Sequence, residues 1–153
     1  GVLVCAAITR LARGKTDVVM MLNGALGGLV AITAEPLMPS PLMAIIIGGI
    51  GGALVFAGTE LLVSLKIDDV VGAIPVHLIA GIWGTLAVPI TNPDTSFGTQ
   101  LLGTASICVF VFVVSFIIWA IMKATIGIRI SEEAEKEGTD VAETGVIAYS
   151  IRD

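Results

Sequence analysis

The sequence predicts an all-α membrane protein, a polytopic bundle of helices, and three observations lead to this prediction. Hydrophobic residues make up 56% of the 153-residue chain, and charged residues make up only 14%. The mean hydropathy of +1.00 indicates more apolar surface than a soluble domain of this length could bury. Several apolar runs are also long enough to cross the hydrocarbon layer, which takes about 20 residues of helix.

The transmembrane part is predicted to cover residues 1–126, with one helix for each apolar run. The first run, 1–9, is too short to span a membrane. We therefore expect it to be the end of a helix whose first half is missing, with Gly1 as a truncation point. Full helices are predicted over about 16–34, 42–65, 70–91 and 100–126. Glycines spaced four residues apart in two of these helices, Gly24 with Gly28 and Gly48 with Gly52, predict close helix packing.

The connections between these helices divide by charge. Those at 10–15 and 65–69 contain basic residues, whereas those at 34–41 and 89–98 contain none. If successive helices alternate in direction, all eight Lys and Arg residues lie on one side of the membrane, which the positive-inside rule predicts to be the cytoplasm. The tail, 127–153, is then cytoplasmic.

Composition and spacing argue against several function classes. The net charge of −5 argues against nucleic acid as a partner. Cys5 and Cys108 lie far apart in apolar runs and are predicted to be buried free thiols. No second ligand is suitably spaced around the single histidine, so neither a metal site nor a cofactor is predicted. The Ser and Thr residues show no nucleophile-elbow motif, so the chain is not expected to be an enzyme.

The single histidine, His77, lies near the middle of the third full helix. On an α-helix it shares one face with small residues that leave space beside the ring. Counted from Asp69 at about 1.5 Å per residue, it lies roughly 12 Å deep, where a neutral imidazole is favoured. The residues alone leave two interpretations open: a group in a substrate pathway, or a hydrogen bond between helices. The small residues of this face are Ala73, Ala80, Gly81 and Gly84.

Other polar and special residues near this helix have predicted structural roles. Pro75 lacks an N–H, so we expect the Val71 carbonyl to lose its helical partner and the helix to bend before the histidine. Asp68 and Asp69 are predicted to cap the helix at its cytoplasmic start. Asn23 is predicted to hydrogen-bond between helices. Trp83 and Trp119, near helix ends, suit anchoring at the membrane interface.

Three stretches resemble motifs of the ammonium transporter family, which includes the Amt, Mep and Rhesus proteins. "IDDVVGAIPVHLIAGIWGTLAVP" (67–89) is similar to the family's histidine signature, a D-D pair followed by V-H and G-I-x-G. "RGKTDVVMMLNGALGGLVAITA" (13–34) resembles its R-G-K-P…A-G-L-V-A-I-T helix. "IGIRISEEAEKEGTDVAETGVIAY" (126–149) resembles its cytoplasmic tail.

The resemblance implies an eleven-helix protomer of two inverted halves in a homotrimer, in which this chain runs from the end of the seventh helix to the eleventh and the tail. It implies transport of ammonium, ammonia or methylammonium through a hydrophobic pore in the plasma or inner membrane, with His77 and Ala73 facing the pathway. Pro75 and Leu78 stand where the family commonly has glycine, and Gly72 where it usually has an aspartate.

The resemblance leaves two other functions open. An ammonium sensor or receptor could use the same scaffold, and a Rhesus-like gas channel is the other alternative. The family also implies a PII-type regulatory protein as a partner. Here the tail reads "ETGVIAY" where "HGExAY" is common, and this difference argues against that partner.

Overall fold

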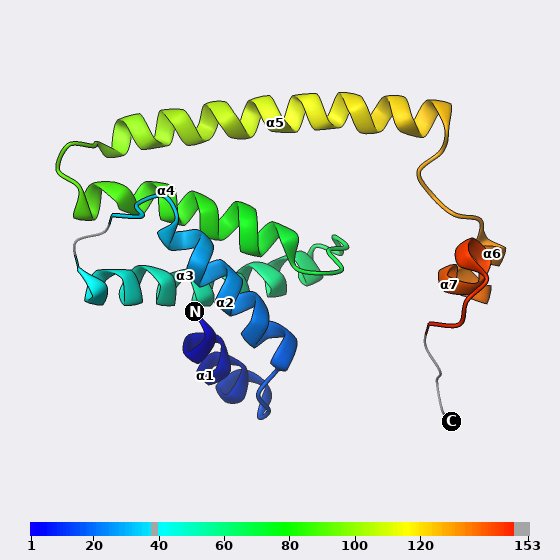
Figure 1. Cartoon of the computed structure of the whole chain (residues 1–153), viewed down its shortest axis with the longest axis horizontal. Coiled ribbons are helices and arrows are strands. Elements are labelled where there is room, and N and C mark those ends of the chain that lie inside the picture. Colours follow the sequence, from blue (N-terminus) through cyan, green and yellow to red (C-terminus); the bar gives the residue numbers. More distant parts are fainter. Residues whose placement is uncertain (38–39, 149–153) are drawn as a thin grey trace. The chain divides into compact units, whose positions relative to one another are not determined.

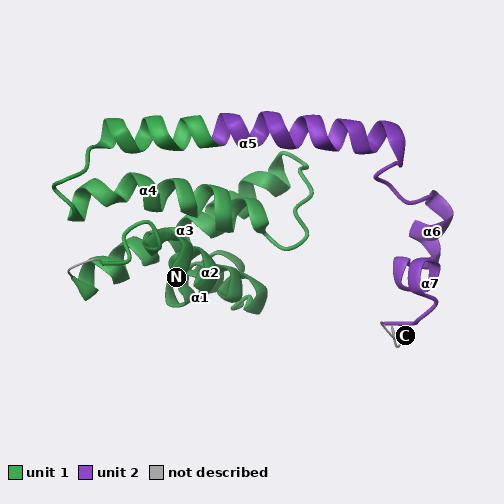
Figure 2. Cartoon of the chain, turned by 45° about the horizontal axis from the view of Figure 1, so that its top comes forward, with its two compact units in different colours: residues 1–107 green, residues 108–153 purple. Residues whose placement is uncertain are grey.

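The computed structural model describes residues 1–37 and 40–148, and every regular element in those ranges is a helix (Figure 1). The chain divides into two compact units, residues 1–107 and 108–153 (Figure 2). The boundary falls within the long helix α5, Phe97–Thr125. The predicted fold class, an all-helical membrane bundle, is confirmed.

Unit 1 contains most of the apolar helices. They are α1 (Val2–Arg13), α2 (Val18–Ile32), α3 (Pro41–Ser64), the π-helical segment η1 (Ile74–Ile79), α4 (Ala80–Thr91) and the first part of α5. Three helical segments of the described ranges are long and apolar enough to cross a membrane: Pro41–Ser64, Ile74–Thr91 and Phe97–Thr125. The helix expected over 16–34 is shorter, with 15 residues, and the helix expected from residue 70 begins later.

Local sequence determines where α2 and α3 begin. Asp17 precedes α2 in extended backbone, and its carboxylate accepts a hydrogen bond from the Met20 N–H at 3.0 Å. Ser40 precedes α3, and its hydroxyl accepts from the Met43 N–H at 3.5 Å. Both side chains satisfy N–H groups that have no partner in the first helical turn. Pro41, in that first turn, has no N–H to satisfy.

Glycines allow α1, α2 and α3 to approach one another closely. A Cβ atom built on Gly48 would lie 3.2 Å from the Gly28 carbonyl oxygen, and one on Gly24 would lie 2.5 Å from the Cys5 sulfur. The Cys5 thiol donates to the Gly52 carbonyl, with 3.0 Å between sulfur and oxygen. The predicted close packing at these glycines is therefore confirmed.

Two small groups of buried side chains form the core of unit 1. One contains Cys5, Met20, Val55, Val76 and Ala80, and the other contains Ala31, Ile47 and Ala87. Trp83 packs against the second group, and its indole N–H donates to the Ile47 carbonyl at 3.0 Å. Trp83 therefore links α4 to α3. This contact is additional to the anchoring at the membrane interface that its position predicts.

Unit 2 contains the rest of α5 and two short helices, α6 (Glu132–Glu137) and α7 (Thr139–Thr144), which pack on each other. Ser131 caps α6 by accepting the Ala134 N–H at 3.2 Å. Arg129 forms an exposed ion pair with Glu135 at 3.0 Å. Such contacts are typical of a solvated segment.

Candidate functional site

The segment before η1 is held by a carboxylate. Asp69 accepts hydrogen bonds from the backbone N–H groups of Ala73 and Ile74, at 2.9 and 2.8 Å. Asp68 is exposed and makes no hydrogen bond to another described residue. Of the two acidic residues, Asp69 thus caps the start of the helix.

A second contact ties the same segment to α2. The Asn23 side-chain amide donates to the Val71 carbonyl at 3.1 Å. Asn23 was predicted to hydrogen-bond between helices, but its acceptor lies in the turn before η1 and not in a helix. Gly72 follows with φ +77°, and a Cβ at this position would lie 2.5 Å from the Asn23 nitrogen. Only glycine suits both the backbone conformation and the short distance. The backbone at Gly72 therefore fits closely against the Asn23 side chain.

Pro75 lies in the first turn of the helix and not in the helix interior. Its side chain is fully buried and lies against α3, since a Cβ on Gly58 would be 3.0 Å from the Pro75 Cβ. The Val71 carbonyl has no helical partner within the described ranges, as predicted, but the reason is that the helix begins after Val71. Proline is tolerated in a first turn, where N–H groups have no helical partner.

This first turn belongs to the π-helical segment η1 (Ile74–Ile79), which also contains His77. The Ala80 N–H donates to the Pro75 carbonyl, a step of five residues where an α-helix has four. His77 and Ala73 are exposed, whereas Ala80 and Gly84 are buried. The prediction that these four residues share one face of an α-helix is therefore wrong. The wider turn of η1 rotates Ala80 and Gly84 relative to Ala73 and His77.

The small residues after η1 serve helix packing. A Cβ on Gly84 would lie 2.4 Å from the Ala31 carbonyl oxygen, so α4 and α2 touch through backbone at this point. Gly81 is half-buried, and a Cβ built on it would lie 3.7 Å from a Val30 methyl carbon, which is an ordinary contact. Gly84 thus packs directly on α2, whereas His77 is exposed.

The imidazole of His77 makes no hydrogen bond to any other residue in the described ranges, so both ring nitrogens are available to a ligand or to another part of the protein. Over those same ranges, no group of three or more His, Cys, Asp and Glu side chains lies close enough to hold a metal ion. The arrangement can offer one donor and one acceptor from a neutral ring.

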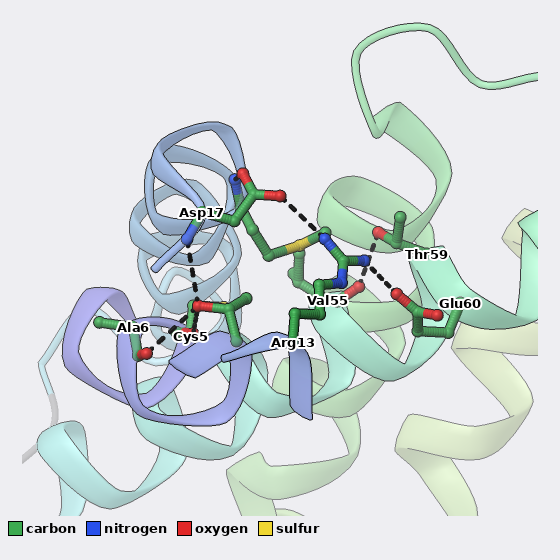
Figure 3. A network of polar contacts seen from close by, with 9 residues as sticks. Cys5, Ala6, Arg13, Asp17, Val55, Thr59 and Glu60 are labelled. Carbon is green, nitrogen blue, oxygen red and sulfur yellow. Dashed lines mark hydrogen bonds and ion pairs between the residues drawn. The ribbon is translucent and has the colours of Figure 1, made fainter. Parts of the chain in front are cut away.

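A polar network that the sequence analysis missed joins α1, α2 and α3 (Figure 3). Arg13, in the last turn of α1, pairs with Asp17 at 2.8 Å and with Glu60 of α3. Its guanidinium also lies over the Phe56 ring, 5.5 Å from the centroid. The four-residue spacing of Arg13 and Asp17, and Glu60 as a charged residue within an apolar run, were the signals in the sequence, but the partners on α3 are remote along the chain.

Thr9 completes this network from within the protein. It is fully buried, and its hydroxyl donates to the Cys5 carbonyl at 2.8 Å while accepting from the Asp17 N–H at 3.3 Å. The turn from α1 to α2 is thus held by the buried Thr9 and by the partly exposed pair of Arg13 and Asp17.

Comparison with known proteins gives consistent matches. Residues 1–149 match the family profile described as "Ammonium Transporter Family". The chain is 38% identical to "Ammonium transporter Amt2" of Archaeoglobus fulgidus, over 97% of this chain and 36% of that protein. It is 38% identical to "Ammonium transporter Amt1" of Haloferax mediterranei, over 90% of this chain and 28% of that protein.

A solved structure named "Sensor Amt Protein" is similar with a TM-score of 0.85 and 30% sequence identity. The similarity covers 94% of this chain and 38% of that one. The chain therefore spans about a third of the length of the relatives it matches.

Proposed function

Because this chain belongs to the ammonium transporter family, we propose that it forms the C-terminal part of a multi-pass membrane protein that transports ammonium or ammonia. The family is one of transporters and not of enzymes. The observation that carries the proposal is the exposed position of His77, in a π-helical turn on a helix long enough to span a membrane.

In this proposal the exposed side of η1 lines the pathway. His77 and Ala73 lie one turn apart there, and the remaining part of the full-length protein would close the pore over them. A bare cation in a dry pore is costly, whereas uncharged ammonia needs only a donor and an acceptor. A neutral imidazole supplies both. Whether a proton accompanies the ammonia is a separate question for measurement.

The rest of the assignment follows from charge and family. All eight Lys and Arg residues fall on one side of the proposed topology, so we place that side and the tail in the cytoplasm, with the protein in the plasma or inner membrane. Membership of the family suggests a homotrimer with one conduit in each subunit. The PII-type regulatory partner is not supported by the tail sequence.

An ammonium sensor is the second candidate, favoured by the similarity to the structure named "Sensor Amt Protein". A sensor would bind ammonium at the same site and change the state of its tail, with little net uptake. A Rhesus-like gas channel would conduct without accompanying charge. Uptake and current measured together in proteoliposomes distinguish the three.

The test replaces His77 in the full-length protein that contains this chain. His77→Ala should abolish or sharply change methylammonium uptake, whereas His77→Gln, which keeps a donor and an acceptor, should keep part of it. Ile90→Ala is the matched control, since Ile90 is exposed on the same helix and about 20 Å away. Uptake that is unchanged in His77→Ala, at equal amounts of folded protein, would contradict the proposal.

A further inference from the structure

The end of α5 that belongs to unit 2 carries an apolar groove of about 600 Å³. It is lined by Phe116, Trp119, Ala120, Lys123, Ala124 and Ile128. Two of these six residues, Ala120 and Ala124, have small side chains. Its one charged member is a lysine at the end of the helix, and its largest apolar members are aromatic.

Two polar groups in this groove have no partner in the described part of the chain. Neither the Lys123 ammonium nor the Trp119 indole N–H forms a hydrogen bond or ion pair there. The basic residue that follows, Arg129, is instead paired with Glu135 at 3.0 Å. Lys123 therefore offers an unpaired positive charge beside an apolar surface, and the Trp119 side chain next to it is 56% exposed.

The apolar surface of the groove continues along α5 from Phe116 to Phe112, away from Lys123. Phe116 stacks on Phe112, with the ring centroids 6.2 Å apart. Lys123 and Phe112 are eleven residues apart, which corresponds to about 16 Å of helix. That length is close to half of the hydrocarbon core, which is about 30 Å thick. The apolar surface from Lys123 to Phe112 thus has about the length of one leaflet. The charged Lys123 lies at the end nearest the membrane surface.

A different side of α5 is suited to packing on other helices. Its less exposed side chains are Gln100, Thr104, Cys108, Ser115 and Met122, which recur at steps of four and seven and so share one side. The Thr104 hydroxyl is buried on this side without a hydrogen-bond partner among residues 1–37 and 40–148. Small and polar side chains of this kind favour contact between membrane helices. Phe116 and Lys123 point about 100° and 80° away from Ser115, and Trp119 about 40° away, so the groove lies beside the polar side.

From these observations we propose that the groove binds an anionic phospholipid of the cytoplasmic leaflet. The phosphate lies at Lys123 and Trp119, and one acyl chain follows Phe116 and Phe112. Cytoplasmic leaflets carry anionic lipids, and a lysine near the surface contributes about 1 kcal/mol to their attraction, which is roughly a fivefold preference. The inference uses the proposed membrane orientation and does not depend on the ammonium pathway.

The experiment uses the full-length protein in phosphatidylcholine nanodiscs that contain either acyl-brominated phosphatidylglycerol or acyl-brominated phosphatidylcholine. The signal is the tryptophan fluorescence that disappears in Trp119→Phe, so other tryptophans do not contribute. Brominated phosphatidylglycerol should quench this signal at about one fifth of the mole fraction that phosphatidylcholine needs. Lys123→Ala should bring the two lipids to equal quenching, whereas Lys123→Arg should keep the preference.

Lys15→Ala is the matched control, because Lys15 is an exposed basic residue on the same proposed side and does not line the groove. It should leave the preference unchanged, and so should excess inorganic phosphate. Equal quenching by both lipids in the unsubstituted protein, or a preference that survives in Lys123→Ala, would overturn the proposal. Absence of quenching by either lipid would show that protein covers the groove, which also overturns it. Loss of the preference with inorganic phosphate would identify a phosphate site in place of a lipid site.

Discussion

Replacing Arg13 measures how much the network between α1, α2 and α3 contributes to stability. The Arg13 side chain is 40% exposed and that of Glu60 is 48% exposed, so solvent screens their attraction. Ion pairs of this kind contribute about 0.2–1 kcal/mol each, and an exposed cation–π contact about 0.5–1 kcal/mol. With two ion pairs and one ring contact, we expect Arg13→Ala to lower the free energy of unfolding by about 1–2 kcal/mol.

A double-mutant cycle separates the charge pair from the packing. Arg13→Met keeps a long side chain over Phe56, and Glu60→Gln keeps the shape of its partner. In the full-length protein, titrated with SDS from a folded micellar state, the coupling between these two changes should be about 0.5 kcal/mol at low salt. It should fall at high salt, since solvent-exposed charges are screened over a Debye length of about 3 Å at 1 M.

Lys15→Met provides the control for loss of a positive charge in the same region, because no ion pair of Lys15 is formed within the described ranges. Its unfolding free energy should change by less than about 0.5 kcal/mol. A coupling between Arg13 and Glu60 that is indistinguishable from zero, or one that is unaffected by salt, would refute the reasoning from this network.

Three further changes test the packing around the candidate site by the same SDS titration. Gly84→Ala should cost about 1–3 kcal/mol, because its Cβ would overlap a carbonyl of α2, whereas Gly103→Ala has open space and should be neutral or stabilising; equal effects would contradict the close contact. Asp69→Ala should lower the free energy of unfolding by about 0.5–2 kcal/mol, because the helix cap is lost, and Asp68→Ala should lower it by less than about 0.5 kcal/mol. A larger effect of Asp68→Ala than of Asp69→Ala would contradict this assignment of the cap. Asn23→Leu should cost about 0.5–1.5 kcal/mol, since an exposed hydrogen bond to a backbone carbonyl is lost; an unchanged titration would mean that this bond contributes nothing to stability.

The fold class could be predicted because it depends on composition. A chain with 56% hydrophobic residues has few alternatives to membrane helices, and its glycine pairs mark close contacts whichever helices meet there. Asn23 was also predictable as a hydrogen-bonding residue, since a polar group in an apolar run needs a partner. The partner itself, the Val71 carbonyl, was not predictable, because it lies 48 residues away and outside a helix.

The arrangement around His77 was harder to predict, for a reason of helix geometry. Sequence periodicity assumes a constant 3.6 residues per turn, and a single wider turn invalidates the pattern for every residue after it. Pro75 was recognised as unusual, but its position in the first turn depends on where the helix begins. Asp69 sets that start by accepting the Ala73 and Ile74 N–H groups, and the sequence alone does not distinguish it from Asp68 as the capping residue.

The wider turn allows one short helix to satisfy two opposite requirements. In an uninterrupted α-helix, His77 and Gly84 would lie within about 20° of each other, because seven residues complete nearly two turns. Contact with α2 needs glycine pressed against backbone, whereas a side chain in a pathway needs open space beside it. The segment Ile74–Ile79 separates these two positions, so that Gly84 is buried and His77 is exposed. The direction of the imidazole is therefore set by the backbone of η1 and the cap before it, and only secondarily by the side chains beside the ring.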